Sequence, residues 1–156
     1  MSLVEQLVNI YENQETWHTK KLSPDEALAY YEVALEKDRI IPYLNSFGEL
    51  TGYVESWAIN YEQFGRILCR LSFNIKKEDI NTGNICYIEA TWIKKDERGF
   101  GRPIQQYLTK KVFEKNFNCE FFVGEAMRKQ AGFVKILKRT DAIKKYLKEE
   151  ISYGKG

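Results

Sequence analysis

Residues Asn84 to Leu108 read NICYIEATWIKKDERGFGRPIQQYL, and this stretch decides the fold. Its first part, Asn84 to Ile93, is apolar on both faces, which predicts a strand at the centre of a sheet. Asp96 to Pro103 has the composition of a turn, and apolar residues then recur at helical spacing over 104–115. The stretch therefore predicts a strand that runs into a helix through a turn with two glycines and two arginines.

A glycine-rich turn in front of a helix is suited to bind an anion, because the first helical N–H groups have no partner within the helix. Gly99 and Gly101 allow the backbone to approach an anion closely, and Arg98 and Arg102 can donate charge-assisted hydrogen bonds. The spacing is not that of a P-loop or of the dinucleotide fingerprint, since no GK[ST] follows and Ile104 stands where a third glycine would be. A plain turn with two solvated arginines is the alternative interpretation.

The sequence before this stretch predicts two helices and a hairpin. Apolar spacing indicates a helix over 3–11, and the segment SPDE at 23–26 is a capping box that starts a second helix ending near Lys37. RIIPYLN (39–45) and LTGYVESWAI (50–59) predict paired strands, of which the first is an edge or irregular strand because it contains Pro42. Residues 61–82 are ambiguous, with either a helix broken by Gly65 or a loop.

The sequence after it predicts two strands, CEFFVGEA (119–126) and FVKILKR (133–139), and a C-terminal helix at 141–150. The fold class that follows is α+β, with a mixed, mostly antiparallel central sheet and helices on both faces. We expect one domain over 1–156, made of a helical part (1–37), a sheet core (38–140) and a C-terminal helix and tail (141–156).

Composition narrows the functional classes. The 24 basic and 22 acidic residues nearly cancel, which does not favour a general nucleic-acid binder. The three cysteines form no CxxC pair, and the single histidine cannot supply a His-rich metal site, so we expect neither a disulfide framework nor a metal. No signal peptide and no long apolar run is visible, so we expect a soluble cytoplasmic protein with no membrane partner.

The segment WIKKDERGFGRP (92–103) resembles the coenzyme-A site of the GNAT superfamily of N-acetyltransferases, whose pattern is [Q/R]-x-x-G-x-[G/A]. Arg98 matches the first position and Gly101 the central glycine, whereas Pro103 stands where Gly or Ala is expected. The hairpin at 45–59 resembles the second and third strands of the family. The resemblance covers roughly residues 24 to 140 and implies a divergent, trimmed member with an acyl-CoA N-acyltransferase-like fold.

This resemblance implies acetyl-CoA as co-substrate. Backbone N–H groups of 99–102 would hold its pyrophosphate, the backbone of 89–93 its pantetheine arm, and Lys94, Lys95, Arg102, Lys110 or Lys111 its 3′-phosphate. The implied cofactor-binding residues are Trp92, Ile93, Lys94, Arg98, Gly99, Phe100, Gly101 and Arg102. Pro103 removes one N–H donor from this cradle.

Acyl transfer to an amine needs a base for the amine and an acid for the leaving thiolate. The family often uses a strand glutamate and a tyrosine, so Glu89 and Glu55 are the candidate bases; an apolar setting would raise their pKa. Alternation places Glu89 on a face with Ile85, Tyr87, Thr91 and Ile93, and Glu55 on a face with Tyr53, Trp57 and Ile59. A solvated sheet face or an arginine partner is the alternative for both. No tyrosine follows CEFFVGEA, where the family's acid usually lies, so Tyr107 is the candidate acid, with Tyr87 and Tyr146 as other substitutes.

Three functional hypotheses follow. The first is an N-acetyltransferase that moves an acetyl group from acetyl-CoA to an amine of an unidentified small molecule or protein. The second is a non-catalytic domain of the same fold that binds a protein or a nucleic acid, as Pro103 and the missing tyrosine would allow. The third, from a resemblance to toxin-activating acyltransferases, uses a carrier-protein donor and His18. A homodimer stays open, and the acceptor would be chosen by 15–24 and 61–82, which carry no readable motif.

Overall fold

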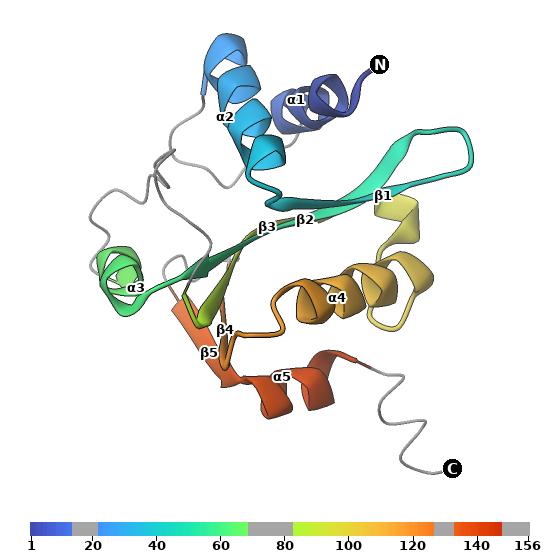
Figure 1. Ribbon diagram of the computed structural model, residues 1–156. Helices are drawn as coiled ribbons and strands as arrows, with labels where there is room; N and C mark the ends of the chain where they lie inside the picture. Colours follow the sequence, from blue (N-terminus) through green and yellow to red (C-terminus); the bar gives the residue numbers. More distant parts are fainter. Residues whose placement is uncertain (14–21, 69–82, 127–132, 148–156) are drawn as a thin grey trace.

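The computed structural model describes residues 1–13, 22–68, 83–126 and 133–147 (Figure 1). The elements in chain order are α1 (Leu3–Asn13), α2 (Pro24–Glu36), β1 (Ile40–Leu44), β2 (Leu50–Ile59), α3 (Tyr61–Leu68), β3 (Ile85–Ile93), a short 3₁₀ turn (Lys95–Glu97), α4 (Pro103–Lys115), β4 (Phe121–Ala126), β5 (Phe133–Lys138) and α5 (Arg139–Tyr146).

These elements lie within a few residues of the predicted ones. The capping box is present, because the Glu26 N–H donates to the Ser23 hydroxyl (3.2 Å) and the Ser23 N–H donates to the Glu26 carboxylate (3.0 Å). The ambiguous segment begins as a helix that continues through Gly65, and a reciprocal cap between Asn60 and Gln63 starts it. The rest of that segment, 69–82, lies outside the described residues.

The five strands lie side by side in the order β1-β2-β3-β4-β5. The pair β3–β4 is parallel, and the pairs β1–β2, β2–β3 and β4–β5 are antiparallel. The predicted central strand is the middle one, and α4 is the crossover that the parallel pair requires. The predicted α+β class, with a mixed and mostly antiparallel sheet, is confirmed.

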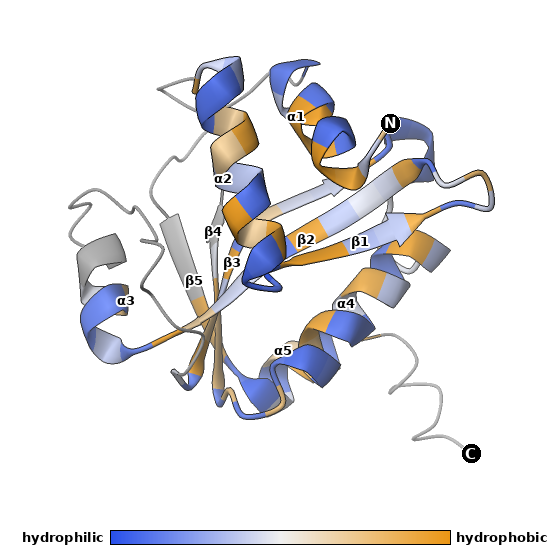
Figure 2. Ribbon diagram, turned by 45° about the horizontal axis from the view of Figure 1, so that its top comes forward, coloured by the Kyte–Doolittle hydropathy of each residue, from blue (hydrophilic) through white to orange (hydrophobic). Residues whose placement is uncertain are grey.

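Helices cover both faces of the sheet, with α1 and α2 on one side and α4 and α5 on the other (Figures 1 and 2). We call these the α1/α2 face and the α4/α5 face. Alternation along β2 sends Tyr53, Glu55 and Trp57 to the α1/α2 face, and it sends Val54 and Ser56 to the α4/α5 face. No helix of the described segments is long and apolar enough to cross a membrane.

A β-bulge in β3 changes the predicted faces of that strand. Glu55 pairs with Ala90 and Ser56 pairs with Ile88, so Glu89 is the extra residue. One extra residue reverses the alternation beyond it. The prediction that Glu89 shares a face with Thr91 and Ile93 is therefore wrong, because those two side chains lie on the α4/α5 face. The prediction that Glu55 shares a face with Trp57 is confirmed.

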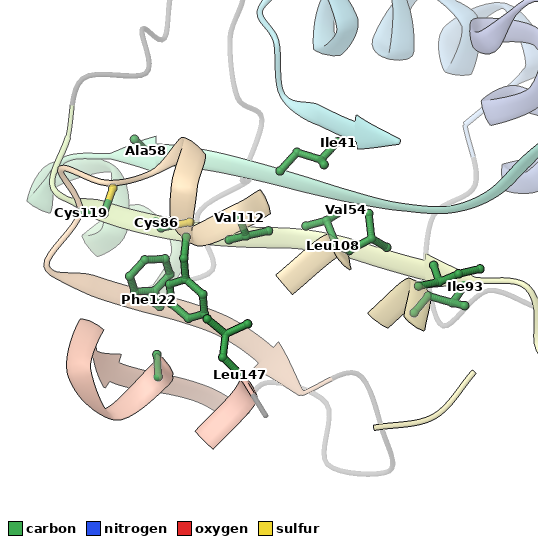
Figure 3. Packing of buried hydrophobic residues seen from close by; sticks show 13 residues of the cluster. Ile41, Val54, Ala58, Cys86, Ile93, Leu108, Val112, Cys119, Phe122 and Leu147 are labelled. Carbon is green, nitrogen blue, oxygen red and sulfur yellow. The ribbon is translucent and has the colours of Figure 1, made fainter. Parts of the chain in front are cut away.

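The main core lies between the sheet and the helices of the α4/α5 face (Figure 3). Helix α4 packs closely on β2, because a Cβ atom built on Gly52 would lie 2.8 Å from Ile104 Cγ2 and 3.3 Å from Leu108 Cδ1. Arg139 closes the other end of α4, donating to the carbonyls of Asn116 (2.8 Å), Phe113 (3.0 Å) and Cys119 (3.3 Å). The position of α4, and of the turn before it, is thus held at both ends.

Candidate active site

The glycine-rich turn has the backbone conformation that its glycines permit. Gly99 and Gly101 have φ of 143° and 84°, which other residues rarely adopt. The turn is closed by the Arg102 N–H donating to the Gly99 carbonyl (3.1 Å), and the first bond of α4 runs from Gln106 N to Arg102 O (3.0 Å). The N–H groups of Ile104 and Gln105 therefore precede the hydrogen-bonded ladder, at the positive end of the helix dipole.

Pro103 occupies the first position of α4. Proline is common there because its missing N–H would have no partner within the helix. The cradle is thus poorer by one donor, but the two N–H groups that follow are kept.

The two arginines brace the turn. Arg98 Nε donates to the Ile93 carbonyl (2.6 Å), and Arg102 Nη1 donates to the Asp96 carbonyl (2.9 Å). Arg102 also lies 3.8 Å from the Glu97 carboxylate. Phe100 at the tip is exposed, and Lys94 is paired with Glu49 at 3.3 Å. In this structure the arginine side chains hold the loop that an anion would contact.

Strands β3 and β4 separate on the side of the sheet that leads to the glycine-rich turn. β3 pairs with β4 only from Ile85–Phe121 to Ile88–Gly124, although β3 continues to Ile93. From Glu89 onward, the edge of β3 that faced β4 has no ladder partner in β4. Backbone groups on an unpaired edge can bind an extended ligand in the way a neighbouring strand would.

A cavity of about 400 Å³ lies at this opening, between the sheet and the helices of the α4/α5 face. Its lining is mostly apolar: Val54, Ile88, Thr91, Ile93, Gln105, Leu108, Thr109, Val112, Phe113, Phe122, Val123, Gly124, Leu137, Ala142 and Tyr146. Two of these residues contact the turn directly, since Gln105 Oε1 accepts from the Gly101 N–H (3.3 Å) and the Ile93 carbonyl accepts from Arg98. The cavity therefore joins the glycine-rich turn to the point where the strands part.

Glu55 lies on the opposite face of the sheet and is only 2% exposed. Its Oε2 accepts a hydrogen bond from the Trp57 indole N–H (2.9 Å) and another from the Tyr30 hydroxyl of α2. Burial raises the pKa of Glu55, while the bonds from Tyr30 and Trp57 act in the opposite direction. Glu55 is a buried, oriented carboxylate and not a solvated one.

Glu89, the bulge residue, is half-buried on the same side. Burial raises the pKa of Tyr30, and the negative charges of Glu55 and then Glu89 raise it further. Glu89 precedes Ala90, the cross-strand partner of Glu55, so the two candidate bases lie on neighbouring strands where β3 and β4 part.

The candidate acid Tyr107 lies elsewhere. It is 41% exposed, and its ring packs edge-on against Tyr43 of β1 at 5.0 Å and beside the ammonium of Lys111 at 5.6 Å. It is not among the residues that line the cavity, so the structure does not bring it together with Glu55 or Glu89. Of the other tyrosines, Tyr87 is buried in the core and Tyr146 lines the cavity. His18 and the segment 127–132 lie outside the described residues.

Sequence reasoning missed Tyr30, Arg39 and Gly124. Arg39 is 3% exposed and stacks on the Trp57 ring at 4.6 Å, and no described residue accepts a hydrogen bond from its Nε or Nη1. Burial lowers the pKa of Arg39 to about 10. The available signal for this cluster was the spacing of Glu55 and Trp57, two residues apart on one strand face. Tyr30, by contrast, looked like one more residue of an apolar helix stripe.

The described residues contain no group of three or more His, Cys, Asp or Glu side chains that could hold a metal ion.

No protein-family model and no curated protein sequence matches this chain. Solved structures do match. GphF, a GNAT-like decarboxylase in complex with isobutyryl-CoA, aligns over 78% of this chain and 60% of its own, with 16% identity and a TM-score of 0.54. A GNAT superfamily phosphinothricin acetyltransferase from Sinorhizobium meliloti, in complex with acetyl-CoA, aligns over 79% of this chain and 62% of its own, with 13% identity and a TM-score of 0.50.

The chain spans about three fifths of the length of these two neighbours. At such low identity the similarity establishes the fold alone: this protein has the acyl-CoA N-acyltransferase-like fold that these GNAT structures share. The predicted fold resemblance is confirmed. One of the two neighbours is a decarboxylase and the other is an acetyltransferase. The fold alone therefore does not identify the reaction that a protein catalyses.

Proposed function

We propose that this protein is an acyl-CoA-dependent N-acyltransferase, with acetyl-CoA as the simplest donor and an amine as acceptor. The observation that carries the proposal is the cavity, which connects the glycine-rich turn to the separation of β3 from β4, with Glu89 at that separation. A thioester donor could then extend from the glycine-rich turn, through the cavity, to the strand separation. Its reactive carbonyl would lie there beside the base for the acceptor.

The donor would bind from the α4/α5 face. Its pyrophosphate would lie against the turn at Gly99 to Arg102, where N–H groups of Ile104 and Gln105 and the helix dipole favour negative charge. Its pantetheine arm would extend along the edge of β3 beyond Ile88, where β4 no longer pairs with it. Lys94, Lys95, Arg102, Lys110 and Lys111 remain the candidates for the 3′-phosphate, and a bound phosphate would compete with Glu49 for Lys94 and with Glu114 for Lys111.

The acceptor would approach from the α1/α2 face, where Glu89 and Glu55 lie. The amine nitrogen bonds to the thioester carbonyl carbon and the C–S bond breaks; the proton lost by nitrogen goes to Glu89, and the thiolate leaves with a proton from a donor in the cavity. Glu55, held by Tyr30 and Trp57, would position Tyr30 beside Glu89. Tyr146 is a better candidate for the acid than Tyr107, because it lines the cavity.

The test is calorimetric titration of the protein with acetyl-CoA, with dephospho-CoA as the comparison ligand. We expect saturable binding that weakens when the 3′-phosphate is absent. Gly101→Ala should weaken the binding, because alanine is strained at φ 84° and the strain would reshape the turn. Gly48→Ala is the matched control: Gly48 has φ 76° but lies in the β1–β2 turn, so it carries a similar strain outside the cradle.

Two outcomes contradict the proposal. If acetyl-CoA does not bind at millimolar concentration, the turn keeps its shape without this use, and the non-catalytic binding domain becomes the better interpretation. If acetyl-CoA binds but equally well in Gly101→Ala, the donor lies elsewhere than in the turn. A donor on a carrier protein would be indicated by transfer from an acylated carrier without affinity for free acetyl-CoA.

A further inference from the structure

The cavity has two chemically different ends. The polar side chains that line it are Thr91, Gln105, Thr109 and Tyr146, and three of these belong to the first turns of α4 or lie beside them. Gln105 bonds to the Gly101 N–H (3.3 Å) and to the Thr109 hydroxyl (2.9 Å), and Gln106 of the same turn donates to the Tyr146 carbonyl (3.1 Å). We call this the loop end of the cavity.

The far end lies beneath the paired part of β3 and β4. Its lining comes from Ile88 and Gly124, which form the last pair of the parallel ladder, and from Val112, Phe113 and Phe122. The rings of Phe113 and Phe122 are in contact, with centroids 4.7 Å apart. None of the described side chains that line this end carries a polar atom. Figure 3 shows Val112 and Phe122 extending into the space between the sheet and α4.

The two parts of an acyl-CoA differ in the same way. A pantetheine arm carries two amide groups, which lose free energy if they are buried without hydrogen-bond partners. Partners exist at the loop end and along the unpaired edge of β3, and side-chain partners are missing at the far end. A hydrocarbon chain has no such requirement and gains free energy from burial among phenylalanine and valine side chains.

Gly124 has no side chain, and this leaves space in the cavity between the strand separation and the far end. A Cβ atom built on Gly124 would meet no atom within 4 Å, although Gly124 lies in the middle of β4 and lines the cavity. Glycine is disfavoured inside a strand unless another group approaches its backbone. Its backbone does not require it either, because Gly124 does not have a positive φ. The space beside Gly124 is therefore available to a ligand.

We propose that the far end of the cavity holds the hydrocarbon chain of an acyl-CoA longer than acetyl, and that Gly124 determines how long this chain can be. This inference rests on the proposed function, and it replaces acetyl with a longer aliphatic acyl group as the preferred donor. The thioester lies where β3 and β4 part, next to Glu89, and the chain extends from it under the paired strands. The reaction at the carbonyl carbon is unchanged.

The experiment is a calorimetric comparison of acetyl-, butyryl-, hexanoyl- and octanoyl-CoA on the full chain, with free CoA as reference. Each methylene that enters an apolar site adds a binding contribution worth roughly fourfold in affinity. We therefore expect the affinity to rise by up to about this factor for each added methylene, until the far end is full. The plateau then reports the length that the cavity accepts.

Variants at Gly124 test whether the chain lies at the far end. Gly124→Ala, Gly124→Val and Gly124→Leu fill the open space by increasing amounts, and a β-branched residue suits a strand, so Gly124→Val should fold. We expect the affinity ratio of octanoyl-CoA to acetyl-CoA to fall stepwise along this series toward one. Gly65→Ala is the matched control, because Gly65 is also open but lies on α3, away from the cavity, and its ratio should equal that of the original protein.

The outcomes separate this inference from the proposed function. Acetyl-CoA binding with no gain for longer chains overturns the inference and leaves the proposed function in place. A gain with chain length that persists in Gly124→Leu also overturns it, because the chain would then lie outside the cavity. If neither CoA nor any thioester binds, the proposed function itself fails, and the inference fails with it.

Discussion

The side chains that meet on the α4/α5 face leave a cavity of about 400 Å³ among apolar groups, whereas those on the α1/α2 face enclose a buried carboxylate and its hydrogen-bond donors. The same strand, β2, contributes Val54 to the first face and Glu55 to the second. One face thus offers an apolar cavity, and the other carries a buried carboxylate with two hydrogen-bond donors.

In a reaction of two substrates, a β-sheet can separate the donor site from the groups that transfer a proton. In the proposed function, the donor binds on the α4/α5 face, the acceptor approaches from the α1/α2 face, and the two meet where β3 and β4 part. Variants on one face should therefore change one property and leave the other nearly intact.

Replacing the proposed base should have the largest effect. Glu89→Gln removes the proton acceptor but keeps the size and the bulge, and we expect turnover to fall by about 100- to 10,000-fold. The affinity for acetyl-CoA should change little, because the proposed donor contacts at this point are with the β3 backbone, which the substitution keeps. Steady-state rates and calorimetry on the same sample measure both, with the exposed Glu120→Gln as control. A parallel loss of rate and affinity would show that the two faces are not separable.

A shift of α4 should weaken packing and donor binding on the α4/α5 face. Gly52→Val places a side chain where Ile104 and Leu108 already lie, so α4 must shift outward. We expect a loss of about 1–3 kcal/mol in the free energy of unfolding, as for other overpacked cores. We also expect weaker binding of acetyl-CoA, since the turn before α4 shifts with it. Urea unfolding and titration measure the two effects; unchanged affinity in a destabilised variant would place the donor away from α4.

Removing one donor to Glu55 should disturb the α1/α2 face alone. Trp57→Phe keeps the ring on which Arg39 stacks but loses the N–H that Glu55 accepts. We expect about 1–2 kcal/mol of destabilisation, because a buried carboxylate loses a partner. The affinity for acetyl-CoA should stay the same. Urea unfolding measures the first quantity and calorimetry the second, and a weaker donor affinity in this variant would contradict the separation of the faces.

The smallest expected effect is a change of stability with pH. Burial raises the pKa of Glu55 above its ordinary value of 4.5, so the folded protein keeps the proton more tightly than the unfolded chain. This contribution is complete below the ordinary pKa and is lost as the pH rises through the raised one. The stability of Glu55→Gln relative to the original protein should therefore increase from pH 4 to pH 8.

Urea unfolding of both proteins across that range measures this difference. If the relative stability of Glu55→Gln instead decreases as the pH rises, the hydrogen bonds from Tyr30 and Trp57 outweigh burial. Glu55 would then be a stably ionised group in the folded protein.

Much of the fold was predictable because its signals are local. The capping box at Ser23, the strand over 85–93 and the turn with Gly99 and Gly101 each depend on neighbours a few residues away. The central position of β3 followed from its apolar character on both faces, and the fold resemblance followed from the turn.

What could not be predicted from the sequence has no local signal. The bulge at Glu89 arises from the register between β2 and β3, and it moves Thr91 and Ile93 to the cavity. Tyr107 has the helical spacing of a core residue, yet its side chain is 41% exposed and its ring packs against Tyr43. The lengths and packing of distant segments set both outcomes.

The order of helices and strands, the glycine-rich turn and the alternation that puts Glu55 on one face with Trp57 could be read from the amino-acid sequence. Only the tertiary structure decided that Tyr30 meets Glu55, that β3 and β4 part after Gly124, and that a cavity lies at that point. Capping and side-chain alternation act over a few residues of one segment. A cavity and the hydrogen bond from Tyr30 to Glu55 form between segments distant in the chain, and their geometry depends on how all the segments pack together.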